Sequence, residues 1–67
     1  MDQEWKCIYK SGNLIEVEIL HGMLTENGIA AVVINKKDSS YLFGEAELYV
    51  KAEDVIEATR LISETQE

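Results

Sequence analysis

The fold is decided by residues 13–35, which read NLIEVEILHGMLTENGIAAVVIN. Val17, Leu20 and Leu24 recur at intervals of three and four residues, which is the spacing of one face of an amphipathic helix. The helical pattern runs from Leu14 to Asn27. We therefore predict a helix over this range, with the three apolar side chains facing the core.

Both ends of this predicted helix carry residues that are typical of helix termini. Asn13 can cap the first turn with its side-chain oxygen, and Glu16 then stands at the third helical position, as in a capping box. Gly28 can adopt the left-handed conformation that ends many helices. The following run, Ile29–Asn35, is apolar at every position but its last. It predicts a strand with apolar side chains on both faces.

Three more segments complete the predicted elements. Trp5–Lys10 and Glu45–Lys51 alternate apolar and polar side chains, which is typical of strands with one apolar face. In the first of these strands, alternation predicts Cys7 in the core and Ile8 on the opposite face. The stretch from Glu53 to about Glu64 has the periodicity of an amphipathic helix.

The resulting order is β-α-β-β-α, in a single domain that covers residues 1–67. The third strand fits between the two parallel strands of a split βαβ unit, which predicts an α+β, ferredoxin-like half-open sandwich. We expect the sheet order 1-3-2, with both helices on one face. The predicted core consists of Val17, Leu20, Leu24, Leu48, Val50, Val55 and Ile62.

The composition excludes several classes of partner and cofactor. Thirteen acidic residues face six basic ones, giving a net charge of −7 that repels nucleic acid and anionic membranes. Cys7 and His21 are the only soft metal ligands, whereas a structural zinc site needs four, so we expect no structural metal. A single cysteine cannot form a disulfide within the chain, and we expect no cofactor. We expect His21 to be a partly buried, hydrogen-bonded residue. The absence of a signal peptide in Met1–Glu4 and of a long apolar run predicts a cytoplasmic protein.

The chain resembles a bacterial domain-of-unknown-function family described as "putative prokaryotic signal-transducing proteins". Five short pieces carry the resemblance: Asn13–Glu18, Leu24–Ile29, Asn35, Leu48–Val50 and Glu53–Asp54. The resemblance implies a ferredoxin-like or PII-like fold in a cytoplasmic bacterial protein, with a signalling role by analogy to the PII regulators. It implies no catalytic residues.

The segment Lys36–Gly44 is the candidate ligand-binding loop. It combines cations, hydroxyls and aromatic rings that could bind an anion or a nucleotide, and the residues concerned are Lys36, Lys37, Asp38, Ser39, Tyr41 and Phe43. The alternative is that the loop packs on itself and covers the sheet. The segment has no glycine-rich phosphate cradle, so its ligand signal is nonspecific. The sequence favours the second interpretation, because short loops with apolar side chains usually pack on themselves.

A second candidate surface is the sheet face that the helices leave uncovered. Alternation places Ile8, Val32, Ile34 and Tyr49 on this face, and exposed apolar patches are typical of interfaces. We therefore predict a homo-oligomer or a protein partner.

From these observations we predict a non-enzymatic regulatory or interaction module that associates with itself. The alternative is a small-ligand sensor that uses the Lys36–Gly44 loop. An enzyme is disfavoured because the sequence identifies no nucleophile–base pair. Glu45 and Glu47 are two residues apart on one strand face, and we expect both carboxylates to be solvated surface groups.

Overall fold

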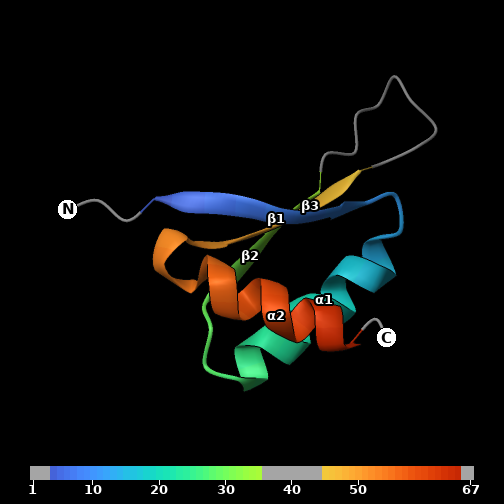
Figure 1. Ribbon diagram of the computed structural model, residues 1–67. Coiled ribbons are helices and arrows are strands. Elements are labelled where there is room, and N and C mark those ends of the chain that lie inside the picture. The colour runs from blue at the N-terminus through green and yellow to red at the C-terminus, as the bar shows by residue number, and fades with distance from the viewer. Residues whose placement is uncertain (1–3, 36–44, 66–67) are drawn as a thin grey trace.

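The computed structural model describes residues 4–35 and 45–65 (Figure 1). Its elements, in chain order, are β1 (Trp5–Ser11), α1 (Leu14–Glu26), β2 (Ala31–Asn35), β3 (Ala46–Lys51), the 3-10 turn η1 (Ala52–Asp54) and α2 (Val55–Thr65). The predicted order β-α-β-β-α is confirmed. β2 begins two residues later than predicted, because the backbone of Ile29 is still engaged in ending α1.

The three strands form one sheet in the order β1-β3-β2, as predicted. β3 is antiparallel to both neighbours, so β1 and β2 are parallel to each other. Both helices lie on the same side of the sheet and run in opposite directions (Figure 1). This is the α+β ferredoxin-like arrangement. We call the sheet face opposite the helices the open face.

The N-terminus of α1 is capped by Asn13, as predicted. Its Oδ1 atom accepts hydrogen bonds from the backbone N–H groups of Ile15 and Glu16, at 3.0 and 3.4 Å. The second half of the predicted capping box is wrong. The Glu16 carboxylate accepts hydrogen bonds from the side chains of Tyr9 and Ser11, and the backbone N–H of Asn13 donates to the Ser11 hydroxyl at 3.0 Å.

The C-terminus of α1 is closed by a Schellman motif around Gly28. This glycine has a φ of 83°, a conformation that costs any residue with a Cβ atom. Its N–H donates to the carbonyl of Thr25, and the N–H of Ile29 donates to the carbonyl of Leu24, both at 3.0 Å. Leu24 and Ile29 are both buried in the core, so the turn also sets the direction in which the chain leaves the helix.

A β-bulge at Ile8 changes which side chains of β1 face the core. Cys7 pairs with Tyr49 and Tyr9 pairs with Leu48, so Ile8 is the extra residue. Paired residues of antiparallel strands share a face, and the bulge therefore places both Ile8 and Tyr9 against the core. The prediction that Cys7 is a core residue was wrong, because Cys7 lies exposed on the open face. The placement of Ile8 on the open face was also wrong.

The core lies between the sheet and the two helices. Its buried members are Val17, Leu20, Leu24, Ile29, Ala46, Leu48, Val50, Ala58 and Ile62. Val55 was predicted to be buried but is only half-buried, since it stands at the first position of α2, where the 3-10 turn joins the helix. Neither described helix has the length and hydrophobicity that a membrane span requires.

Candidate functional site

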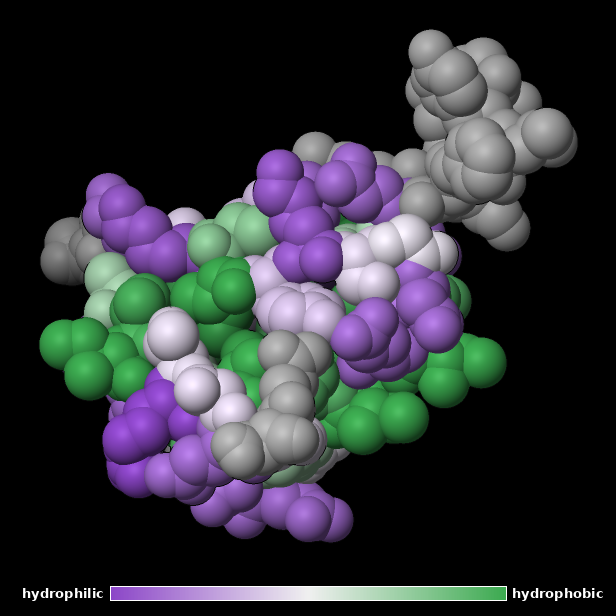
Figure 2. Space-filling model, turned by 45° about the vertical axis from the view of Figure 1, so that its right-hand side comes forward, coloured by the Kyte–Doolittle hydropathy of each residue, from purple (hydrophilic) through white to green (hydrophobic). Residues whose placement is uncertain are grey.

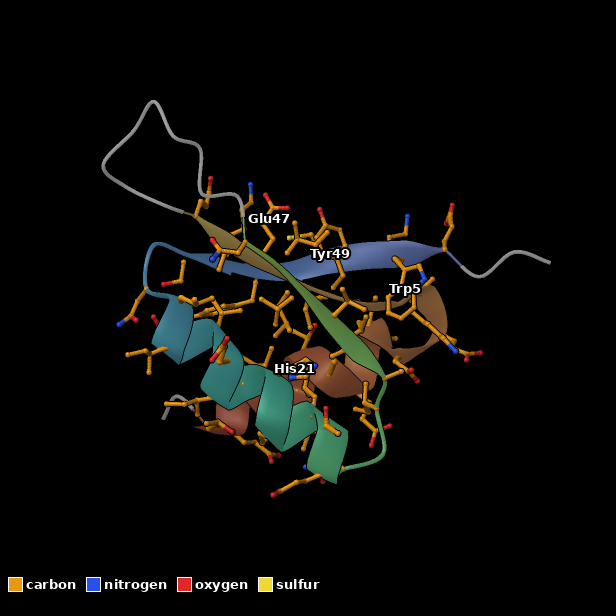
Figure 3. All side chains as sticks on the ribbon, turned by 180° about the vertical axis from the view of Figure 1, so that it is seen from behind. Trp5, His21, Glu47 and Tyr49 are labelled. Atoms are coloured by element: carbon orange, nitrogen blue, oxygen red, sulfur yellow. The ribbon has the colours of Figure 1, made fainter. Side chains whose placement is uncertain are left out.

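The open face carries a group of apolar side chains that come from all three strands. Val32 of β2 pairs with Tyr49 of β3, and Ile34 lies two residues further along the same face. Trp5 joins them from β1, and the four side chains line a shallow hollow of about 350 Å³. We call Trp5, Val32, Ile34 and Tyr49 the open-face patch. Trp5, Glu47 and Tyr49 are labelled along the sheet in Figure 3.

The members of the patch are incompletely covered. Trp5 and Val32 each keep 42% of their surface exposed and Ile34 keeps 41%, whereas Tyr49 is half-buried. Both described helices lie on the other side of the sheet (Figure 1), so neither of them covers the patch. Removing such apolar surface from water stabilises by roughly 25 cal/mol per Å², which favours association.

Tyr49 is held in place by a hydrogen bond within β3. Its hydroxyl donates to Glu47 Oε1 at 2.7 Å. This bond, together with desolvation by burial and the nearby Glu47 carboxylate and Cys7 side chain, raises the pKa of Tyr49 above its ordinary value of 10.0. Tyr49 is therefore a neutral donor at physiological pH. The hydrogen bond to Glu47 orients the Tyr49 ring within the open-face patch.

Glu47 differs from its predicted role as a solvated carboxylate. It is only 6% exposed, and that prediction was wrong. Its position on the central strand explains this burial, because β3 has a neighbouring strand on each side. Glu45 is exposed, as expected.

Lysine side chains lie beside the patch. Lys51 pairs with Trp5 across the strands, and its Nζ atom is 6.0 Å from the centre of the indole ring, within the range of a cation–π contact. Lys10 stands opposite Glu47 in the same ladder. The surroundings of the patch therefore include positive charge, in contrast to the acidic chain as a whole.

His21 has a structural role that fits the sequence prediction. Its ring is half-buried between α1 and the sheet (Figure 3), and Nε2 lies 3.0 Å from the carbonyl oxygen of Ala31. Because a carbonyl can only accept, Nε2 carries the proton and donates it. The histidine ties α1 to the start of β2. His21 lies on the opposite side of the sheet from Cys7. Among the described residues, no group of three His, Cys, Asp or Glu side chains could hold a metal ion.

The structure brings together some of the predicted site residues. Val32, Ile34 and Tyr49 share the open-face patch, while Ile8 packs against the core. The predicted interface residues did not include Trp5, because strict alternation through β1 puts it on the same face as Cys7, which was predicted to lie in the core. The predicted ligand residues Lys36, Lys37, Asp38, Ser39, Tyr41 and Phe43 all lie outside the described residues.

A family model described as "Putative prokaryotic signal transducing protein" matches residues 5–66. No curated protein and no solved structure matches the chain significantly.

Proposed function

We propose that this chain, which belongs to the family described as "Putative prokaryotic signal transducing protein", is a non-enzymatic interaction module that associates with itself through its open-face patch. The observation that carries this proposal is the exposure of Trp5, Val32 and Ile34 around the half-buried Tyr49. Apolar side chains gathered on one face are typical of protein–protein interfaces, in which aromatic residues are enriched.

The placement of the polar side chains supports a role without catalysis. The Tyr49 hydroxyl is engaged by Glu47, and the His21 ring donates to a backbone carbonyl. Cys7 lies on the open face, whereas His21 lies on the helix side, so the sheet separates the thiol from the imidazole. A nucleophile needs a base within hydrogen-bond distance, and these two residues do not form such a pair.

A two-fold symmetric dimer is the simplest form of the proposed association. In a face-to-face dimer, each Trp5 and Tyr49 would lose water contact against the partner's patch. The net charge of −7 opposes the approach of two copies, but salt screens this repulsion beyond about 10 Å. A patch of this size has to offset the entropic cost of association, and we therefore expect a dissociation constant in the micromolar range.

The single tryptophan of the chain makes this proposal directly testable, because it belongs to the patch. Sedimentation velocity and Trp5 fluorescence should be followed across a protein concentration series. We expect the sedimentation coefficient to rise with concentration while the emission maximum shifts to shorter wavelength. Both changes should share one midpoint, since both report burial of the same surface.

A pair of lysine variants localises the contact. Val32→Lys places a charge in the patch and should leave the protein monomeric across the series. Ile56→Lys changes an isoleucine of α2 that is 85% exposed, and it should associate like the wild type. Circular dichroism establishes that both variants remain folded. A wild-type protein that stays monomeric, with constant Trp5 emission up to millimolar concentration, would falsify the proposal.

A further inference from the structure

The outer face of α1 carries a second apolar surface, far from the open face. Ile15 and Ile19 are 68% and 61% exposed. Together with Gly22 they occupy positions i, i+4 and i+7, which lie on one side of a helix. Figure 2 shows one side of the molecule, on which hydrophobic residues (green) reach the surface among hydrophilic ones (purple).

This surface borders a groove between the two helices. Because α1 and α2 run in opposite directions, the first half of α1 lies beside the end of α2 (Figure 1). The groove has a volume of about 330 Å³. Its lining residues are Asn13, Ile15, Glu16, Ile19, Leu20 and Thr65. A groove between antiparallel helices can receive a third helix, since helices pack with ridges of side chains in the grooves of their neighbours.

Gly22 has no evident role in the fold itself. A Cβ atom built at this position would meet nothing within 4 Å, and the residue does not have a positive φ. A glycine inside a helix destabilises it relative to alanine. Its lack of a side chain would instead let the backbone of a docked helix approach α1 closely, next to Ile15 and Ile19.

The charge of the helical layer indicates the chemistry of the partner. α1 carries Glu16, Glu18 and Glu26 and has no lysine or arginine. In α2, the guanidinium of Arg60 is paired with Glu64 at 3.3 Å. The lysines among the described residues all belong to the sheet, namely Lys6, Lys10 and Lys51. Two copies of the α1 face would therefore repel each other, whereas a cationic surface would be attracted.

We propose that the outer face of α1 binds a cationic amphipathic helix of a partner protein. The apolar stripe of that helix would cover Ile15 and Ile19 and cross α1 closely at Gly22. Its lysine or arginine side chains would face the exposed carboxylates of Glu18 and Glu26. This contact is independent of the proposed self-association, which uses the opposite side of the molecule.

Synthetic helical peptides of about 18 residues, or five turns, provide the probe. The first contains leucine and lysine, with leucine at i, i+3, i+4 and i+7. The second has the same composition in an order that breaks the leucine stripe, and the third has glutamate in place of lysine. Fluorescence anisotropy of labelled peptides measures binding, and amide chemical shifts of the protein locate it.

We expect only the first peptide to bind well and to shift the amides of Ile15, Ile19 and Gly22. Ile19→Gln should weaken its binding by about tenfold, because the variant loses buried apolar surface. Gly22→Ala should raise the melting temperature and yet weaken binding, a combination that a purely structural role of this glycine would not produce. Ile56→Gln is the matched control, since it removes an exposed isoleucine outside the groove.

Three results would overturn the proposal. Equal binding of the first two peptides would mean general electrostatic attraction, and unchanged affinity in Ile19→Gln would place the contact elsewhere. Shifts confined to Val32 and Tyr49 would assign the peptide to the open face. The self-association experiment tests the open-face patch, whereas the peptide experiment tests the outer face of α1. Either proposal can therefore fail without the other.

Discussion

The hydroxyl of Tyr9 donates a hydrogen bond to the carboxylate of Glu16, and this contact joins β1 to the first turn of α1. The Ser11 hydroxyl donates to the other carboxylate oxygen at 2.9 Å. Both bonds favour the charged carboxylate and lower the pKa of Glu16 below its ordinary value of 4.5. Tyr9 has the larger effect, and partial burial opposes both bonds.

This contact predicts an acid-dependent loss of stability. A carboxyl group with a lowered pKa in the folded state stabilises the protein above its unfolded pKa, and this stabilisation is lost as the pH falls through the folded pKa. The free energy of unfolding should therefore decrease below about pH 4.5. Urea titrations at a series of acidic pH values measure the free energy of unfolding.

Two variants test the role of the contact in this pH dependence. Tyr9→Phe should reduce the slope of stability against pH by removing the stronger of the two donors. Glu18→Gln removes an exposed carboxylate from the same helix and should keep the wild-type slope. A Tyr9→Phe profile parallel to that of the wild type would contradict the assignment.

Leu24 lies at the centre of the core and has no exposed surface. Leu24→Ala should lower the free energy of unfolding by roughly 2–5 kcal/mol, through lost burial and the cavity left behind. Ile56→Ala, on the exposed side of α2, should change it by no more than about 0.5 kcal/mol. Chemical denaturation measures both values, and a loss below about 1 kcal/mol for Leu24→Ala would show that the helix face is wrongly assigned.

Gly22, inside α1, and Gly28, just after it, should respond oppositely to substitution by alanine. Gly28→Ala should cost about 1–2 kcal/mol, because φ is 83° in the turn that ends the helix. Gly22→Ala should stabilise by about 0.5–1 kcal/mol, because the helix gains propensity and the new methyl group enters open space. Thermal and urea unfolding of the two variants compare them directly, and effects of the same sign would be incompatible with these conformations.

Cys7 should react with a thiol reagent in the native protein, because the bulge exposes it on the open face. The rate should approach that of the unfolded chain at low protein concentration. It should fall as the concentration rises if the open faces associate. Cys7→Ser should change the free energy of unfolding by about 0.5 kcal/mol or less. A thiol that reacts only in denaturant would be evidence for the buried position that alternation predicts.

The extent of α1 could be predicted from the sequence because its signals are local. Asn13 caps the first turn and Gly28 ends the last one, and both act through backbone groups within five residues of themselves. The apolar spacing of Val17, Leu20 and Leu24 likewise depends only on the helix repeat. The sheet order followed from the sequence of elements, since few topologies fit a β-α-β-β-α chain.

The composition of the open-face patch was decided by tertiary structure. The bulge at Ile8 depends on how β1 pairs with β3, a strand from the other end of the chain, and alternation within β1 carries no signal of it. Because of this one extra residue, Cys7 is exposed, Ile8 packs against the core, and Trp5 lies beside Tyr49 on the open face. Glu47 is buried where Lys10 of β1 and Ile34 of β2 stand opposite it, and this register is likewise set only by strand pairing. Helix limits and element order thus come from local chemistry, whereas the face that each side chain of β1 occupies is fixed only when distant strands pair.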